Sequence, residues 1–416
     1  MKWRHHMKTV GIIAEYNPLH NGHGYQLARA KELTGADYVI VILSGDFTQR
    51  GIPALIDKYT RTEMALCAGA DLVLELPVCF ATGSAEFFAS GAVSLLDGLG
   101  VDYLCFGSES GDLETLEHIS RILAAEPSDF KCSLSEHLQR GMSFPAARNL
   151  ALEEHLASAG QNDAVSRIKN GLLEAANNIL GVEYLKAMHR LDSTMQAVTL
   201  RREGSGYLDD TLPHGSFCSA LAVRKWLLSG KDISALKPFL PESSLEFLSK
   251  ASSQNSLLSE DDFSSLLFYR LLALHSEGYT AFADVSQALS DKITGNLFSF
   301  QSWSQFCGIL KSRDLTYTRI SRCLLHILLD IRVQEKVAPY ARILGFKEAS
   351  KPLFGSLKSG KIPLIAKLAD AGNLLSDTAL SILEQDIFAA HVYDSIAAQK
   401  KGGPIQNEYR RQIIIK

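Results

Sequence analysis

Short apolar runs alternate with amphipathic segments through the first hundred residues. The runs expected to form buried strands are KTVGIIAEY (8–16), DYVIVIL (37–43), DLVLELP (71–77) and VDYLCFG (101–107). Between them, residues 22–36, 58–70 and 84–100 place apolar side chains at helical spacing. Near-continuous apolar strands that alternate with helices are typical of a parallel sheet covered on both faces. We therefore predict an α/β fold with a doubly wound, Rossmann-like parallel sheet.

Strand patterns become sparse after Gly107. Residues 112–190 are mainly helical in pattern, 195–202 indicate one further strand, and 216–230 indicate a loop that turns into a helix. From about residue 230 the pattern is nearly all helical, most clearly at 264–279, 319–331 and 362–375.

Length also requires more than one unit, because 416 residues exceed one ordinary core. We predict a sheet domain over 7–228 and a mainly α-helical C-terminal domain over 229–416. Residues 1–6 precede a candidate start at Met7 and are treated as an extension or a remnant.

Composition narrows the class of protein. Hydrophobic residues make up 46% and charged residues 21% of the chain, which is typical of a folded globular protein. No apolar run reaches the roughly 18–20 residues of a membrane span. Seven scattered cysteines, none in a CxxC pair, favour reduced thiols and a cytoplasmic location over disulfides or structural zinc. A net charge of −4 gives no overall attraction to nucleic acid, so such a partner requires a local basic patch.

The segment EYNPLHNGH (15–23) carries the clearest chemistry. It follows the first predicted strand, where ligands bind at the carboxyl edge of an open α/β sheet. The helix that follows would direct free N–H groups and its positive dipole end at that edge. Gly22 would allow the backbone to approach a phosphate, and His20 and His23 could donate hydrogen bonds to its oxygens. An isolated HxxH pair is more often a helix cap, and zinc lacks a third ligand at suitable spacing, so no metal site is predicted in the protein itself.

Several motifs together resemble the bacterial tRNA(Met) cytidine acetate ligases, within the HxGH nucleotidyltransferase superfamily. They are HNGH, SGDFTQRGIPA, KYTRTEMAL, GADLVLELP, FGSES, NNILGVEYLKA and TYTRISR. The segment SALAVR (219–224) resembles the second superfamily signature but has Leu221 where a threonine is usual. The resemblance is continuous over about 7–225 and extends to near 346.

The resemblance implies an ATP site at the carboxyl edge of the predicted sheet, with His20, His23 and Arg224 as catalytic residues. The residues it assigns to ATP binding are Ile13, Ala14, Glu15, Tyr16, Asn17, Pro18, Leu19, His20, Asn21, Gly22, His23, Gly24, Tyr25, Gln26, Gly107, Asn177, Arg202 and Ser219. Two of these assignments depend on register, since Asn178 adjoins Asn177, and Arg201 and Glu203 adjoin Arg202.

The acetate site is expected at the end of the second strand. Arg50 could orient a carboxylate through two hydrogen bonds, with Asp46 beside it, or the two could pair with each other. Lys58 and Arg61, on the next predicted helix, are expected on a solvated face.

A basic stretch in the C-terminal region is a candidate RNA contact. Lys311 and Arg313 precede a predicted helix on which Arg319, Arg322 and His326 share one face. Tyr317 could stack on an unpaired base. Without the resemblance, a charged solvent face would be the better interpretation.

The expected activity is that of an ATP-dependent ligase. By resemblance it uses ATP and Mg²⁺ to activate acetate as acetyl-adenylate, and then acetylates the exocyclic amine of the wobble cytidine of elongator tRNA(Met). The sequence indicates no obligate protein partner. The alternatives are a nucleotidylyltransferase that adenylates a phosphorylated metabolite, and a non-enzymatic RNA-binding protein with a degenerate nucleotide fold.

Overall fold

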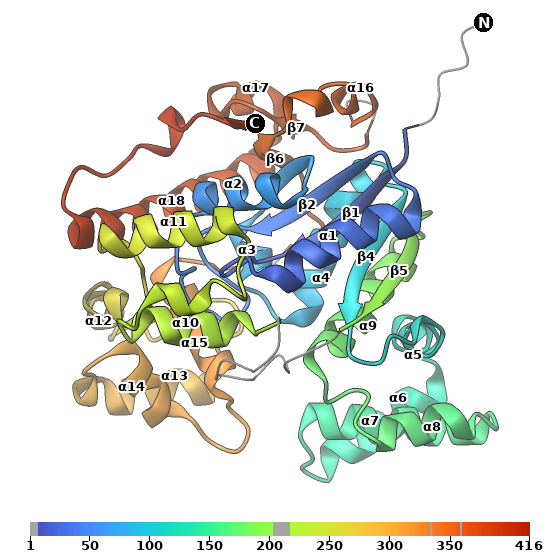
Figure 1. The fold of residues 1–416 in the computed structure, drawn as a ribbon. Helices are drawn as coiled ribbons and strands as arrows, with labels where there is room; N and C mark the ends of the chain where they lie inside the picture. Colours follow the sequence, from blue (N-terminus) through green and yellow to red (C-terminus); the bar gives the residue numbers. More distant parts are fainter. Residues whose placement is uncertain (1–6, 203–216, 333–334, 358–359) are drawn as a thin grey trace, which may run out of the picture.

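An eight-stranded, mostly parallel sheet forms the centre of the molecule (Figure 1). The computed structural model describes residues 7–202, 217–332, 335–357 and 360–416. The strands are β1 (Thr9–Ala14), β2 (Tyr38–Ser44), β3 (Leu72–Leu76), β4 (Tyr103–Ser108), β5 (Gln196–Arg201), β6 (Ala341–Phe346), β7 (Leu364–Ile365) and β8 (Ile414–Ile415). The four runs predicted as strands correspond to β1 to β4, and 195–202 contains β5. The predicted α/β fold class is confirmed.

Helices connect these strands and continue through the C-terminal half. The α-helices up to β5 are α1 (Asn21–Thr34), α2 (Lys58–Ala68), α3 (Val78–Ala81), α4 (Ala85–Gly98), α5 (Leu113–Ala125), α6 (Ser128–Gln139), α7 (Phe144–Ser158), α8 (Asn162–Lys169) and α9 (Ala176–Arg190). The later ones are α10 (Ala220–Leu228), α11 (Glu242–Ser253), α12 (Ser264–Ala273), α13 (Gln287–Asn296), α14 (Trp303–Leu310), α15 (Tyr317–Leu328), α16 (Leu353–Leu357), α17 (Ala371–Leu374) and α18 (Asp377–Lys401). In the described part of the chain, no helix is both long enough and apolar enough to cross a membrane.

The order of the strands places a crevice between β1 and β4. The chain runs from β1 through β2 to β3 in one direction, then crosses back so that β4 pairs with the other side of β1. These strands are parallel, so their carboxyl ends share one edge. A reversal of strand order leaves an open crevice at that edge, which is where ligands bind in sheets of this kind.

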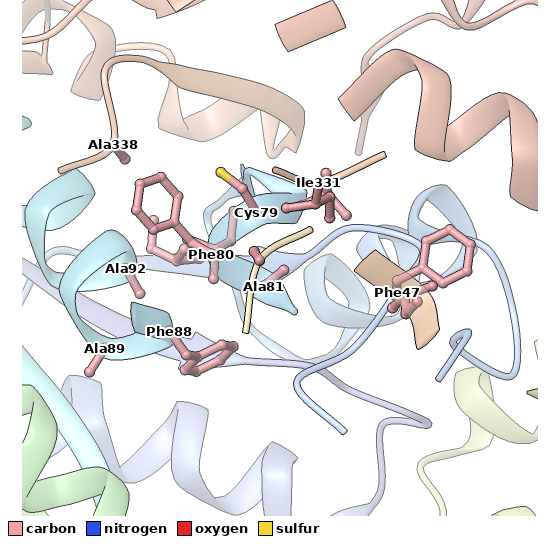
Figure 2. Packing of buried hydrophobic residues seen from close by; sticks show 14 of the residues in the cluster. Phe47, Cys79, Phe80, Ala81, Phe88, Ala89, Ala92, Ile331 and Ala338 are labelled. Carbon is pink, nitrogen blue, oxygen red and sulfur yellow. The ribbon is translucent and has the colours of Figure 1, made fainter. Parts of the chain in front are cut away.

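Alternate residues of the strands pack into two hydrophobic cores, one on each face of the sheet. On β2, Val39, Val41 and Leu43 face a core with α1, α2, α10 and α11. Ile40 and Ile42 face the larger core with α4, α9 and the later helices. Close packing there depends on Gly91, because a Cβ at that position would lie 2.3 Å from the ring of Phe80. Figure 2 shows this ring beside α4.

The C-terminal half returns to the sheet. Strand β6 pairs antiparallel with β3, and β7 and β8 pair with β6. The prediction that this half is mainly helical is confirmed, but the sequence pattern did not predict its three strands, which join the sheet. The predicted helix at 362–375 instead contains β7 and the short α17.

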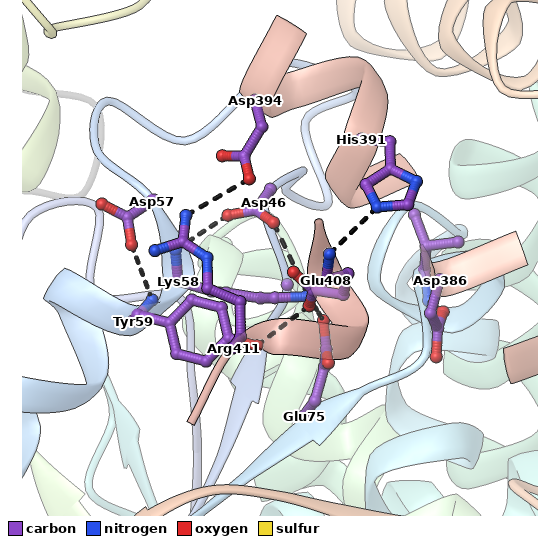
Figure 3. A network of polar contacts seen from close by, with 12 residues as sticks. Asp46, Asp57, Lys58, Tyr59, Glu75, Asp386, His391, Asp394, Glu408 and Arg411 are labelled. Atoms are coloured by element: carbon purple, nitrogen blue, oxygen red, sulfur yellow. Dashed lines mark hydrogen bonds and ion pairs between the residues drawn. The ribbon is translucent and has the colours of Figure 1, made fainter. Parts of the chain in front are cut away.

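A buried ion cluster joins the C-terminal tail to this sheet. We call it the Lys58 cluster, and Figure 3 shows much of it; its members are Asp46, Lys58, Glu75, Arg342 and Glu408. Lys58 Nζ lies 2.7 Å from Glu75 and 2.6 Å from Glu408. Arg342 lies 2.8 Å from the same two carboxylates and faces Glu75 across the β3–β6 pair. Two cations thus share two carboxylates, which offsets the cost of burying four charges.

We predict that Glu408→Ala strongly destabilises the fold. The side chain is buried, and its loss leaves Lys58 and Arg342 with one shared carboxylate, which typically costs about 3–5 kcal/mol. Burial alone would raise the pKa of Glu408, but Lys58 and Arg342 lower it to about 2 from the usual 4.5. This stabilisation is therefore fully present above pH 4.5 and is lost as the pH falls towards 2.

Urea denaturation at pH 7 measures this effect. The control is Glu348→Ala, which removes an exposed carboxylate that forms a surface ion pair with Lys351 and should leave the midpoint nearly unchanged. Equal midpoints for the two variants would contradict the role of Glu408.

Candidate active site

A cavity of about 140 Å³ opens between the carboxyl ends of β1 and β4. Its lining comes from both faces of the sheet, from α1 and α10 on one side and from α4 and α9 on the other. The residues that line it are Ile13, Ala14, Glu15, Tyr16, Asn17, His20, His23, Gln26, Gln49, Arg50, Phe88, Phe106, Gly107, Asn177, Leu180, Tyr184, Arg202, Ser219, Ala220, Leu221 and Arg224. All three residues predicted as catalytic therefore face one cavity.

The two histidines at the start of α1 are fixed by hydrogen bonds to the backbone and by stacking of their rings. His20 is the N-cap residue, and its Nδ1 accepts a hydrogen bond from the backbone N–H of Gly22 at 3.1 Å. The Nδ1 of His23 accepts a hydrogen bond from the backbone N–H of His20 at 3.2 Å. Their rings stack with centroids 3.7 Å apart. The pair both caps the helix and lines the cavity, so a capping role and a binding role are compatible.

These hydrogen bonds determine where the protons lie. A neutral imidazole has one N–H, and Nδ1 is an acceptor in both rings, so each Nε2 carries the proton and is a donor. Burial and the nearby charge of Arg202 lower the pKa of His20 to about 3. Burial, His20 and Arg202 also hold the pKa of His23 well below its usual value. Near pH 7 the pair thus presents two neutral N–H donors.

The start of α10 forms the opposite rim of this polar side. Ser219 is the N-cap of α10 and accepts a hydrogen bond from the N–H of Ala222 at 3.0 Å. Arg224 donates to the carbonyl oxygen of Asn17 at 2.8 Å, which joins α10 to the loop before α1. Leu221 also lines the cavity, although a threonine is usual at this place in the resembled signature. The positive dipole ends of two helices therefore meet at one cavity, which favours an anion, although the first-turn N–H groups of α1 already donate to protein acceptors.

The residues predicted for the nucleotide lie at the ends of β4, β5 and α9. Asn177 lines the cavity and donates to Glu109 at 2.7 Å, whereas Asn178 is buried and accepts from the backbone of residues 109 and 110. Arg202 lines it too, and its stem lies 3.4 Å from where a Cβ of Gly107 would be. Arg201 lines only a second, smaller cavity of about 60 Å³ beside the first. Geometry thus favours Asn177 and Arg202 at these two registers, and Glu203 lies outside the described residues.

Arg50 reaches the cavity, but Asp46 does not. Asp46 is buried beneath the loop, where its carboxylate accepts the N–H of Lys58 at 2.8 Å and lies 3.7 Å from Lys58 Nζ. Burial, against the opposing effect of Lys58, raises the pKa of Asp46 to about 7. Asp46 therefore belongs to the Lys58 cluster, and its expected place beside acetate is wrong.

Lys58 and Arg61 are not on a solvated face either. Lys58 is the centre of the Lys58 cluster (Figure 3). Arg61 is fully buried and donates to the carbonyl oxygens of Glu15, Ser44, Gly45 and Ile56. Its guanidinium thereby connects the segment that follows β1 to the segment that follows β2. Both segments contribute residues to the cavity lining.

Some predicted ATP residues support the cavity without lining it. Leu19 is fully buried in the core, and Asn21 donates to the carbonyl oxygen of Pro238 at 2.9 Å. Gly22 and Tyr25 line the second cavity instead. Pro18 and Gly24 line neither of the two.

Sequence reasoning missed one whole wall of the cavity. The lining residues outside the prediction are Gln49, Phe88, Phe106, Leu180, Tyr184, Ala220 and Leu221. Gln49 was adjacent to a predicted residue, and Leu180 and Tyr184 follow Asn177 at helical spacing, which is a usable signal. The sequence gives no such signal for Phe88 and Phe106, because an aromatic residue in an apolar run is the ordinary pattern of a hydrophobic core.

The predicted RNA residues lie around the start of α15. Lys311 and Arg313 are exposed in the loop before it, and Tyr317 is half-buried. Arg319 and Arg322 lie 3.2 and 3.4 Å from one carboxylate, that of Asp284. His326 is buried and bonds to backbone oxygens, so the expectation that it shares an exposed basic face is wrong.

Comparison with known proteins identifies the family. A model of the HIGH nucleotidyl transferase family matches residues 7–408. The chain belongs to this family. Proteins named tRNA(Met) cytidine acetate ligase share 39% identity with it in Clostridium novyi, over 94% of this chain and 96% of that one, and 41% in Thermoanaerobacter pseudethanolicus, over 93% and 95%.

Solved structures of this family agree in fold. TmcAL of Thermotoga maritima, solved without ligand, is 31% identical, and the match has a TM-score of 0.91 over 98% of this chain and 99% of that one. A second structure of that protein, bound with alpha-thio ATP, matches with a TM-score of 0.88 over the same shares. The HNGH segment and the cavity beside it lie within the residues that the family model matches.

The described residues offer no preformed metal site. Among them, no group of three or more histidine, cysteine or acidic side chains could hold a metal ion. Among the described residues that line the main cavity, Glu15 is the only one with an acidic side chain. One of its oxygens accepts the N–H of Gln49 at 2.7 Å. A cation held chiefly by a ligand's phosphates is compatible with this donor set.

We predict that neither active-site histidine titrates between pH 5.5 and 8. Their folded pKa values lie below the usual 6.5, so protonation is favoured only at lower pH and the neutral Nε2–H form persists. Long-range ¹⁵N–¹H spectra of the imidazoles should show Nε2 protonated and Nδ1 unprotonated across this range. His20→Gln and His23→Gln assign the signals, and exposed histidines provide the internal control. A titration near pH 6.5 in either ring would refute the neutral pair.

Proposed function

We propose that this chain is an ATP-dependent ligase that activates acetate as acetyl-adenylate and acetylates the exocyclic amine of the wobble cytidine of elongator tRNA(Met). The observation that carries the proposal is the meeting of two neutral histidine donors, two helix N-termini and Arg224 at one cavity of a HIGH nucleotidyl transferase. Relatives named for this reaction match the chain along nearly all its length.

The first half-reaction is a substitution at the α-phosphorus of ATP. An acetate oxygen forms a bond to that phosphorus, the bond to the bridging oxygen breaks, and pyrophosphate leaves with the electron pair. Negative charge grows on the phosphoryl oxygens, where the Nε2–H groups of His20 and His23 would donate hydrogen bonds. Arg224, Ser219 and the N-terminus of α1 would align the phosphates, and Arg50 would orient the acetate.

The nucleoside would lie at the carboxyl ends of β4 and β5, beside the first turn of α9. Gly107 allows close approach at the end of β4, Asn177 offers an amide, and Arg202 offers a guanidinium. Mg²⁺, when bound to the phosphates, would neutralise part of their charge, with Glu15 as the lining carboxylate able to hold it.

The second half-reaction consumes the acetyl-adenylate. The cytidine amine attacks the acetyl carbon, AMP leaves, and the amine loses a proton. An aromatic amine of this kind is a weak nucleophile, so positioning of the tRNA must supply much of the rate. The surface that positions the tRNA would include Lys311, Arg313 and Tyr317. Arg319 and Arg322 would lie behind them.

Nucleoside mass spectrometry tests the overall function. Elongator tRNA(Met) incubated with the protein, ATP and acetate should yield acetylcytidine at the wobble position, together with AMP and pyrophosphate. Omission of acetate should abolish the product. Adenylation of a small phosphorylated metabolite without acetylation of tRNA would instead favour a metabolite nucleotidylyltransferase.

We predict that His23→Ala lowers turnover by roughly 10²–10³ with little change in ATP affinity, because its hydrogen bond strengthens as charge grows in the transition state. Acetate-dependent ATP–pyrophosphate exchange gives turnover, and calorimetry gives ATP affinity. His189→Ala, on α9 and outside the cavity, is the control. Near-normal turnover with weakened ATP binding would mean that His23 contacts only the ground state.

We predict that Asn177→Ala and Arg202→Ala each weaken ATP binding about tenfold or more, since both should contact the nucleotide. Arg190→Ala removes a guanidinium from α9 outside the cavity and should bind ATP normally. Unchanged calorimetric affinity in both cavity variants would reject this placement of the nucleotide.

We predict that Lys311→Ser combined with Arg313→Ser lowers tRNA affinity and its dependence on salt. Each lost phosphate contact should reduce the slope of log K against log salt by roughly 0.7–0.9. Arg319 and Arg322 share Asp284, so their neutralisation should change the slope less. A Lys351→Ser, Lys361→Ser pair removes the same charge elsewhere. An unchanged slope in the Lys311 and Arg313 variant would place the RNA surface elsewhere.

A further inference from the structure

One wall of the main cavity is apolar and offers no polar side chain of the kind proposed to bind phosphate. It is formed by Phe88 of α4, Phe106 of β4, and Leu180 and Tyr184 of α9. The polar groups assigned to phosphate come from α1 and α10, on the other face of the sheet. The cavity therefore has a charged side and a hydrocarbon side.

The rings of this wall are fixed and nearly covered. Phe88, Phe106 and Tyr184 are only 3%, 4% and 5% exposed, and Phe106 meets Tyr184 edge-on with centroids 5.9 Å apart. Gly181 makes room for Phe106, since a Cβ at that position would lie 2.6 Å from its ring. The apolar surface open to a ligand is therefore small.

Such a surface suits a methyl group better than a base. A stacked base needs an open aromatic face, and Tyr25, 44% exposed beside Phe217 in the second cavity, offers one. Of the groups in ATP and acetate, the methyl of acetate is the small aliphatic one. Arg50, which lines the same cavity, would hold the carboxylate end.

We propose that Phe88, Phe106, Leu180 and Tyr184 form an acyl site that seats the methyl group of acetate and limits the length of the acyl chain. This inference rests on the proposed function and adds the residues that determine substrate specificity. A hydrophobic pocket discriminates one methylene by roughly 10- to 200-fold, so the site should prefer acetate to propionate within that range.

Two substitutions change the size of this site in opposite directions. Leu180→Ala removes a half-buried side chain from the wall and should enlarge the site. Gly181→Ala places a Cβ against the ring of Phe106, so the ring must shift, and we expect this shift to shrink the site. Ile179→Ala, the neighbour on α9 that lines neither cavity, is the control for a side chain lost from this helix.

ATP–pyrophosphate exchange with formate, acetate, propionate and butyrate, without tRNA, tests the acyl site. Leu180→Ala should raise the propionate-to-acetate ratio of kcat/KM by about tenfold or more. Gly181→Ala should raise the formate-to-acetate ratio, and Ile179→Ala should change neither. Thermal unfolding of each variant separates these effects from loss of fold.

The possible outcomes are distinct. If the unmodified protein shows acetate-dependent exchange and both ratios stay constant in the variants, the acyl site is refuted while the proposed function stands. If Leu180→Ala weakens only ATP binding or only the transfer to tRNA, the wall contacts a base and the acyl site is again refuted. If the unmodified protein shows no carboxylate-dependent exchange, the proposed function itself fails.

Discussion

The reciprocal hydrogen bonds between His20, His23 and the first turn of α1 are the constraint on which the site depends. They occupy both Nδ1 atoms with backbone donors, so each Nε2 carries the only proton of its ring. Burial prevents a second proton from binding near neutral pH. The chain thereby places two uncharged donors at a helix N-terminus, where positive potential is supplied by the helix and by arginines rather than by the imidazoles.

The remainder of the fold keeps this edge of the sheet in place. Arg61 binds backbone oxygens after β1 and after β2, and its burial makes those hydrogen bonds costly to lose. The Lys58 cluster holds the start of α2 against β3, β6 and the C-terminal tail. The loop that carries Arg50 is also held by α15, because Ser321 of that helix donates to the carbonyl oxygen of Gly51 at 2.8 Å. The helix proposed to approach tRNA thus contacts the loop proposed to hold acetate.

The sheet and the position of the elements proposed to bind phosphate could be predicted because their signals are local. Each of β1 to β4 lies in a near-continuous apolar run, and HNGH combines a cap, a glycine and two imidazoles within four residues. Lys58, Arg61 and Asp46 could not be placed this way. The polar spacing of Lys58 and Arg61 on α2 resembles that of a surface helix, and Asp46 lies in a loop. The carboxylates that neutralise Lys58 include Glu408, which is distant in sequence. Strand β6 was missed for a similar reason, since a short apolar run within helical sequence becomes a strand only through its pairing with β3.

The central claim is that acetate attacks the α-phosphorus of ATP in this cavity. The most direct measurement uses acetate labelled with ¹⁸O at both oxygens, with ATP and tRNA(Met), and mass spectrometry of the nucleotide and phosphate products. Attack of acetate on the α-phosphorus predicts one ¹⁸O atom in each AMP formed, because the bridging oxygen of acetyl-adenylate stays with the phosphorus when the cytidine amine attacks the acetyl carbon. Unlabelled AMP, or ADP with ¹⁸O in inorganic phosphate, would contradict it.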